Sequence, residues 1–352
     1  MEVKAVDIPN FISVFSSWKC MYACHGCFQS WPSQWKHTLK DKPLFMPLSS
    51  FKLIVDEFSS FRTKIGLYSP AENFLNPDIY DMISYAEKAG CPVECDTTGA
   101  PVDPVRLAET NIHDIIFSID GFTQEAYGRF RRNGNLQNVL DRLVKFTQEI
   151  ERLGTKTNIV VKYLVNAFTE SQIDEARAFY ESLPGVTFKL DFFLPPTPFE
   201  WFHKNRLECS IEEYELWRPK FMTDFDIYFP VAERGVAVHK VMQNSEIGPF
   251  CDNVLLGLTI DTDGTVMPCC KFDFESREDN FYFGNIFDGG GALPVFHGER
   301  ARRFREEYYA QGGNCGRCSS CPHNMSVRER EPMQEIVRRH DFKTMITGIR
   351  AS

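Results

Sequence analysis

The chain has 352 residues, a net charge of −9 at pH 7 and 43% hydrophobic residues, which is enough for a large packed core with a smaller appendage. The acidic balance, without any long basic run, argues against a nucleic-acid partner. No apolar run reaches the ~18 residues that cross a bilayer, and the first residues lack the layout of a signal peptide. We therefore expect no membrane partner and a cytoplasmic location.

The first cysteine group, Cys20, Cys24 and Cys27, directly follows an apolar run at 11–15. Three thiolates on one loop can bind three irons of a cubane iron–sulfur cluster and leave the fourth iron open. A zinc site is the alternative, with His25 as a fourth ligand. The C-x3-C-x2-C spacing resembles the signature of the radical S-adenosylmethionine (SAM) superfamily. This resemblance implies a [4Fe-4S] cluster that binds SAM and, once reduced, cleaves it to a 5'-deoxyadenosyl radical.

Short apolar runs alternate with amphipathic stretches through the first two thirds of the chain, which predicts a parallel sheet with helices outside it. The predicted strands are 11–15, 64–68, 92–97, 114–119, 158–165 and 187–193. The predicted helices are 48–59, 77–89, 136–153 and 171–183. Six strand-helix units resemble the partial (β/α)6 TIM-like barrel of radical SAM enzymes, so we expect the chemistry at the C-terminal ends of the strands.

The segment after the second predicted strand, from Ser69 to Pro77, resembles the family's G-G-E-P-L-x-N-P segment, with Glu72 at the place of its glutamate. The family uses this turn to bind the amino group of SAM. Pro70 and Ala71 replace the two glycines, so the turn has to form without positive φ. A carboxylate that only caps or flanks a helix is the alternative.

Two further strand ends resemble family motifs. Thr97-Thr98-Gly99 stands where the family often has T-N-G, and Ser118-Ile119-Asp120-Gly121, followed by Tyr127 and Arg131, resembles S-x-D-G…Y-x-x-x-R. The resemblance implies that Ser118 contacts the SAM ribose and that Arg131 contacts the SAM carboxylate, a task suited to a guanidinium. Ordinary turn chemistry is the alternative. The expected cofactor-binding residues are Glu72, Thr97, Ser118, Asp120, Arg131 and Asn166.

Two charged residues near the ends of the fifth and sixth predicted strands, Lys162 and Asp191, are candidate catalytic residues. Both belong to the rim where the chemistry is expected, although a solvated strand end is an equally good interpretation. Glu200 is a further candidate base.

The last third of the chain carries a second set of cysteines. Two apolar runs flank the Asp-Gly turn at 263–264, which predicts a β-hairpin with Cys251 near one end and Cys269 near the other. Because a hairpin brings its ends together, these two thiolates can share a metal. A tight loop with Cys315, Cys318 and Cys321 follows a helical stretch rich in Arg and Glu.

This second set resembles the SPASM/twitch extension of radical SAM enzymes, whose opening element is C-x(9–15)-G-x4-C. The resemblance implies one auxiliary [4Fe-4S] cluster in a small α+β twitch domain, with Cys251, Cys269, Cys318 and Cys321 as its ligands. Cys315 is the runner-up for one loop ligand, and a four-thiolate zinc site is the alternative. We expect the barrel at 1–215 and the auxiliary domain at 216–352.

A closed cluster near a substrate radical can accept its electron, which would make the reaction a two-electron oxidation. By resemblance to an aminocyclitol dehydrogenase we expect a radical SAM oxidoreductase that acts on a polar small molecule of sugar or aminocyclitol type. A flavodoxin- or ferredoxin-type reductant would be its partner. The alternatives are a peptide-modifying enzyme, an epimerase with Cys209 as hydrogen donor, and a redox sensor without enzymatic activity. The short segment before Cys20 argues against a leader-binding domain.

Overall fold

The computed structural model describes residues 8–25, 27–30, 42–192, 216–217, 254, 257–269, 281–311 and 318. Its strands are β1 (Phe11–Val14), β2 (Lys64–Leu67), β3 (Val93–Thr97), β4 (Asp114–Ser118), β5 (Asn158–Val165), β6 (Val186–Phe192), β7 (Gly257–Ile260), β8 (Thr265–Met267) and β9 (Gly284–Asn285). Its α-helices are α2 (Leu48–Phe58), α3 (Ile79–Lys88), α4 (Pro104–Glu109), α5 (Gln124–Phe130), α6 (Leu136–Leu153), α7 (Ile173–Glu181), α12 (Ala292–Phe296) and α13 (Glu299–Ala310).

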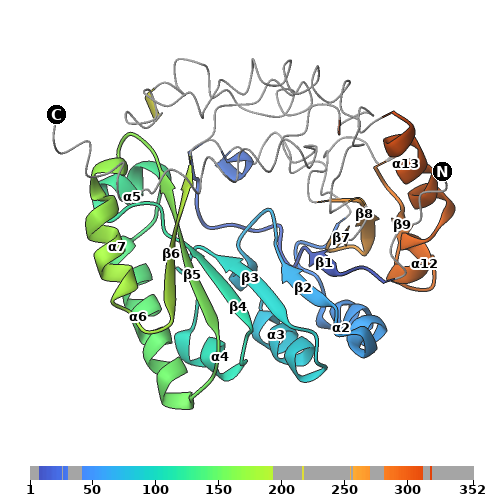
Figure 1. Ribbon diagram of the computed structural model, residues 1–352, viewed down its shortest axis with the longest axis horizontal. Coiled ribbons are helices and arrows are strands. Elements are labelled where there is room, and N and C mark those ends of the chain that lie inside the picture. The colour runs from blue at the N-terminus through green and yellow to red at the C-terminus, as the bar shows by residue number, and fades with distance from the viewer. Residues whose placement is uncertain are drawn as a thin grey trace.

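The strands form one nine-stranded sheet in the order β6-β5-β4-β3-β2-β1-β7-β8-β9. β1 to β6 pair in parallel, and the helices between them cover the outer side of the curved sheet (Figure 1). The six predicted strands and the predicted partial (β/α)6 barrel are thereby confirmed. The short helices α4 and α5 are additions that the periodicity of the sequence did not indicate.

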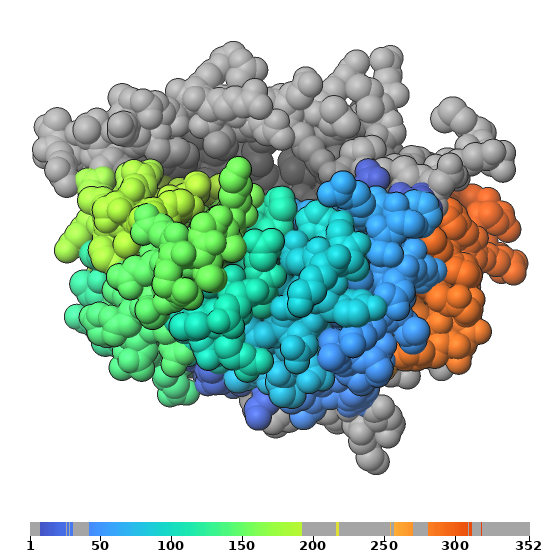
Figure 2. Space-filling view, turned by 90° about the horizontal axis from the view of Figure 1, so that it is seen from below, coloured from blue at the N-terminus to red at the C-terminus, as the bar shows by residue number. Residues whose placement is uncertain are grey.

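The predicted hairpin is also confirmed, and its strands extend the barrel sheet. β7 pairs in parallel with the free edge of β1, and β8 and β9 follow in antiparallel pairing. The helix that follows, α12, lies beside α2, where orange and blue surfaces meet in Figure 2. The predicted domain boundary at 215/216 adjoins a stretch of which only residues 216–217 are described, so it stays a prediction.

Local sequence explains where two of the helices begin and end. The Asp103 carboxylate accepts hydrogen bonds from two backbone N–H groups of the first turn of α4, and Pro104 follows at the first helical position. The Asn135 side chain caps α6 in the same way, and Gly154 ends that helix with φ +66°.

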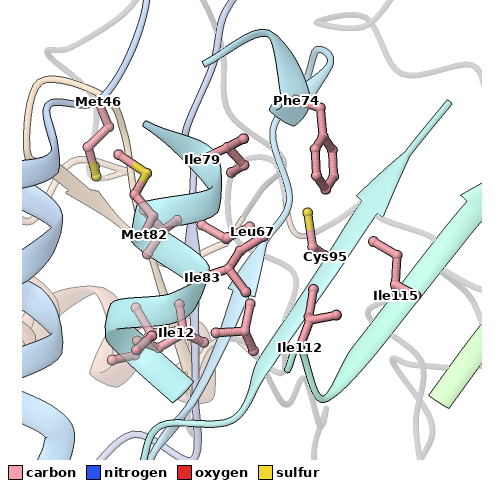
Figure 3. Close-up of a cluster of buried hydrophobic side chains, with 14 of the residues drawn as sticks. Ile12, Met46, Leu67, Phe74, Ile79, Met82, Ile83, Cys95, Ile112 and Ile115 are labelled. Carbon is pink, nitrogen blue, oxygen red and sulfur yellow. The ribbon is translucent and has the colours of Figure 1, made fainter. Parts of the chain in front are cut away.

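The core lies between the sheet and its helices. Figure 3 shows Leu67, Cys95 and Ile115 from the strands facing Ile79 and other residues of α3. Cys95 is fully buried there and packs as a small apolar side chain. Burial raises the pKa of its thiol well above the usual value.

Along β3, β4 and β5 the buried residues alternate with partly exposed ones. The buried set faces the helices, and the alternate set occupies the opposite side of the sheet, which we call the inner face. The inner face of β2 to β6 is rich in charged residues: Lys64, Glu94, Asp96, Asp114, Lys162, Lys189 and Asp191. None of the helices among the described residues combines the length and the apolarity that crossing a membrane requires.

Candidate radical SAM site

The first cysteine loop follows the C-terminal end of β1 and is held against the end of α5. The His25 N–H donates to the Phe130 carbonyl (3.0 Å), and the Ala23 N–H donates to the Arg132 carbonyl (3.5 Å). Cys24 is buried, whereas Cys20 and Cys27 are partly exposed. The loop therefore presents its thiols at the end of the barrel where the parallel strands terminate.

The three thiols of this loop share one electrostatic environment. Burial raises the pKa of Cys20 and that of Cys27 to about 11, and neighbouring thiols of the loop contribute to the rise. Burial also raises the pKa of Cys24, against the lowering effect of Arg131. A metal must therefore displace protons when these cysteines bind it.

The donor set fits a cluster better than a single zinc ion. Among the described residues, no three His, Cys, Asp or Glu side chains surround a point that one metal ion could occupy. A cubane cluster spreads its cysteines over separate irons and so needs no such convergence. The His25 ring, which would be the fourth ligand in the alternative zinc site, stacks on Trp217 with ring centroids 4.2 Å apart. Three soft thiols on one loop suit an iron–sulfur cluster.

Arg131 connects this loop to the end of β4. Its Nε and Nη2 lie 2.6 and 2.5 Å from Asp120 Oδ2, and its Nη1 lies 3.5 Å from Cys24 Sγ. The other Asp120 oxygen accepts a hydrogen bond from the Leu164 N–H (3.1 Å). Gly121, with φ +147°, follows Asp120, and a Cβ at this position would lie 2.6 Å from the Tyr127 backbone nitrogen. The structure thus brings Asp120, Arg131 and Cys24 together.

Glu72 is almost fully buried, and both of its oxygens are occupied. Oε1 accepts from the Phe74 N–H (3.1 Å) and the Thr97 hydroxyl (2.8 Å). Oε2 accepts from the N–H (2.8 Å) and the hydroxyl (2.6 Å) of Thr98. Pro70 and Ala71 do not have positive φ, as expected without the two glycines. Four bonds fill the acceptor capacity of a carboxylate, so a ligand amine reaching Glu72 has to replace one of them.

The remaining expected residues occupy different places. Lys162 Nζ lies 2.9 Å from Asp191 Oδ2 in an ion pair on the inner face of β5 and β6, and Ser118 is level with Lys162 on β4. Asn166 is buried after β5, where its Oδ1 accepts from the Phe168 N–H (2.9 Å). The Asn166 side chain thus supports a turn in this structure.

An Asn73–Asp96 contact that the sequence patterns did not predict lies beside this site. Asn73 Nδ2 donates to Asp96 Oδ1 (2.8 Å) and also to the Asp96 carbonyl (3.0 Å). Burial, together with the negative charge of Glu72, raises the pKa of Asp96 to about 7. The sequence did contain one indication that Asp96 belongs to the site. Asp96 stands directly before Thr97-Thr98-Gly99, on a strand that alternates polar and apolar residues.

The turn of the hairpin packs beside the first cysteine loop. Trp18 Nε1 donates to Asp261 Oδ1 (2.7 Å), Lys42 pairs with the same carboxylate, and the Thr262 hydroxyl donates to the Pro43 carbonyl (2.7 Å). Trp18 stands two positions before Cys20. The C-terminal hairpin therefore directly supports the strand end from which the first cysteine loop departs.

Of the expected auxiliary ligands, Cys269 and Cys318 are partly buried and pack against the hydrophobic core. The other expected or alternative residues lie outside the described residues: Cys209, Cys251, Cys315, Cys321 and Glu200. Their roles stay predictions.

Comparisons with known proteins match this architecture. The model of the SPASM family, an iron-sulfur cluster-binding domain, matches residues 251–322. The mycofactocin maturase MftC of Mycobacterium tuberculosis (strain CDC 1551 / Oshkosh) is 24% identical over 342 residues, which cover 92% of this chain and 78% of the relative.

Two solved structures share the fold. Streptococcus suis SuiB bound to S-adenosylmethionine has a TM-score of 0.57 and 13% identity over 90% of this chain and 72% of SuiB. The anSMEcpe structure with bound AdoMet and the Cp18Cys peptide has a TM-score of 0.56 and 15% identity over 96% of this chain and 98% of its own. Together with the three-thiol loop at the barrel end, these matches confirm the expected resemblance of the chain to radical SAM enzymes that carry a C-terminal SPASM domain.

Proposed function

We propose that this chain is a radical SAM oxidoreductase that removes two electrons and two protons from its substrate. The observation that carries the proposal is the joining of the Cys20–Cys27 loop to the Arg131–Asp120 pair at the C-terminal ends of the barrel strands. Cys20, Cys24 and Cys27 would hold a [4Fe-4S] cluster. Bound SAM and this cluster supply a radical that takes a hydrogen atom from a substrate carbon.

The protein's own residues would orient the cofactor. Arg131 is charged in the interior, where Asp120 holds its Nε and Nη2, so its Nη1 remains directed at the cluster loop. We assign Arg131 to the SAM carboxylate and Ser118 to the ribose. Asp120 is then a positioning residue for Arg131, and the Glu72 network with Thr97 and Thr98 shapes the wall beside the amino group.

The SPASM match supports an electron acceptor in the C-terminal part of the chain. We assign its cluster to Cys251, Cys269, Cys318 and Cys321. The contact between Trp18 and Asp261 supports a fixed arrangement of this part relative to the first loop. Such an arrangement suits electron transfer from a substrate held in the barrel. A flavodoxin- or ferredoxin-type protein would supply the first electron.

For the substrate, the comparisons favour a peptide over the small polar molecule expected from the sequence. The relative that aligns over most of the chain is a maturase, and one structure of the same fold holds a peptide. The charged inner face suits polar groups of either substrate. We therefore propose a polar side chain or terminus of a peptide as the first candidate and an aminocyclitol or sugar as the second.

The first experiment tests SAM cleavage. The full chain is reconstituted anaerobically with iron and sulfide, reduced with dithionite and incubated with SAM, and 5'-deoxyadenosine is measured by chromatography. We expect cleavage by the wild type and by Cys91→Ala, which changes a buried cysteine before β3, and none by the Cys20/Cys24/Cys27 triple alanine variant. Absence of 5'-deoxyadenosine from the wild type would favour a redox sensor and refute the proposal.

The second experiment identifies the reaction. Synthetic peptides encoded beside the gene for this chain, and 2-deoxy-scyllo-inosamine, are offered separately, and products are analysed by mass spectrometry in deuterated water. Loss of two hydrogens supports oxidation. Incorporation of one solvent deuterium at carbon, abolished by Cys209→Ala, would instead identify an epimerase and contradict the proposed oxidation.

A further inference from the structure

Asp96 is an acidic side chain on the inner face of the barrel that no Lys or Arg side chain of the described residues neutralises. Glu94 and Asp114 both pair with Lys64, whose Nζ lies 2.7 Å from Asp114 Oδ2, and Asp191 pairs with Lys162. Asp96 forms no ion pair with any residue that the structure describes. Among the carboxylates of the inner face, in the described strands, it is therefore the one without a cationic partner.

Asp96 is also held in a fixed orientation. Asn73 Nδ2 donates to its Oδ1, and Asn73 Oδ1 in turn accepts a hydrogen bond from the Ser16 hydroxyl (2.6 Å) and another from the Ser69 hydroxyl (2.5 Å). Because Asn73 Nδ2 also donates to the Leu67 carbonyl (2.8 Å), its amide cannot be flipped without losing these bonds. Within the described part of the chain, no other side chain donates a hydrogen bond to Asp96 Oδ2.

The position of Asp96 suits contact with substrate. It stands on the inner face of β3, one residue before Thr97, whose hydroxyl binds Glu72 at the expected SAM amino site. The charged groups that act on it are Glu72 after β2, Lys162 on β5 and Arg131 after α5. The carboxyl thus lies between the expected cofactor site and the charged inner face.

We propose that Asp96 is the proton acceptor of the reaction, an inference that rests on the proposed function. The O–H or N–H bond next to the substrate carbon breaks, and its proton passes to Asp96 Oδ2. The carbon has by then lost a hydrogen atom to the radical derived from SAM, and its remaining electron passes to the auxiliary iron–sulfur cluster. One hydrogen atom, one proton and one electron leave the substrate, and a C=O or C=N double bond forms.

The protonation behaviour of Asp96 fits this task. Burial and the Glu72 charge raise its pKa to about 7, close to the working pH that favours a general base. The Lys162–Asp191 pair is less suitable, because Asp191 is already paired with an ammonium and lies further from the Glu72 turn in strand order. Asp191 and Lys162 can still bind polar groups of the substrate.

The first test needs no substrate. The pH dependence of carboxyl C=O stretching bands is recorded by infrared difference spectroscopy on the reconstituted full chain and on Asp96→Asn, which retains an acceptor for Asn73. We expect one band, titrating with a midpoint of about 7, that is absent from the variant. Lys162→Met should raise the midpoint, because a favourable positive charge is lost, whereas Lys189→Met, on β6, should leave it unchanged. Absence of any band that depends on Asp96 would overturn the inference.

The second test measures product and 5'-deoxyadenosine together, with the synthetic peptide that gives oxidised product with the wild type. Loss of a general base costs on the order of 10²–10⁴-fold, so we expect the ratio of product to 5'-deoxyadenosine to fall at least about tenfold in Asp96→Asn. Asp96→Glu should recover part of it, and Lys88→Met, which changes an exposed lysine in the last turn of α3, should keep the wild-type ratio. An unchanged ratio in Asp96→Asn overturns the role of Asp96 alone. A wild type that forms no 5'-deoxyadenosine overturns the proposed function and this inference with it.

Discussion

Glu72→Gln tests how much the turn after β2 is stabilised by the four hydrogen bonds that the Glu72 carboxylate accepts. Glu72 is 1% exposed and accepts four hydrogen bonds. A glutamine replaces one carboxylate oxygen by an NH2 group. The two hydrogen bonds that this oxygen accepted are lost, and the NH2 group then faces the two N–H or O–H donors that made them. Hydrogen bonds to a charged group contribute about 1.5–3 kcal/mol each. Since a threonine hydroxyl can rotate to accept one N–H, we expect a net loss of about 3 kcal/mol in the free energy of unfolding.

Equilibrium urea unfolding, followed by circular dichroism on cluster-free full-length chains, measures this loss. Glu94→Gln is the matched control, because Glu94 is a partly buried carboxylate on β3 whose side chain is bound to Lys64. An ion pair of this kind contributes about 0–1 kcal/mol. Equal losses in the two variants would show that the four bonds to Glu72 add nothing beyond an ordinary ion pair, and the reasoning would be wrong.

Three further predictions concern other contacts. Because the raised pKa of Asp96 favours its neutral form, wild-type stability should fall relative to Asp96→Asn as pH rises from about 4 through about 7, as measured by urea unfolding across pH. Glu57 accepts hydrogen bonds from the first two N–H groups of α12 (2.7 and 2.8 Å). Glu57→Ala should therefore speed hydrogen exchange of those two amides by about tenfold or more. Glu109→Ala, which changes an exposed glutamate of α4, should leave their exchange unchanged. Trp217→Ala should remove the stack on His25 and destabilise the chain by at least about 1 kcal/mol, with Trp217→Phe intermediate; equal unfolding midpoints would contradict this.

Much of the barrel could be predicted because each strand carries a local signal. The run before Cys20 and the alternation along 158–165 predicted β1 and β5 to within a residue or two. The Asp-Gly turn at 263–264 is a local signal too, and it predicted the hairpin. α4 and α5 were missed because six or seven residues span fewer than two helical turns, too few for a clear period.

Contacts between distant segments could not be predicted from patterns of this kind. The Asn73–Asp96 bond depends on the register of β2 against β3, and Asn73 resembles an ordinary turn residue in the sequence. Glu57 is one of many acidic residues on helix surfaces, and only the packing of α12 against α2 makes it a cap. Asn166 illustrates the same limit, since the hydrogen bond from the Phe168 N–H to its side chain depends on the local turn, and its expected role in cofactor binding stays a prediction.

The pairing of β1 with both β2 and β7 has a consequence for biosynthesis. Until the last third of the chain has left the ribosome, the backbone N–H and C=O groups along one edge of β1 have no strand to bind. An uncovered strand edge is a template for aggregation. Nascent or truncated chains that stop before β7 should therefore need chaperones, and solubility should be recovered once Gly257–Ile260 is available to complete the sheet.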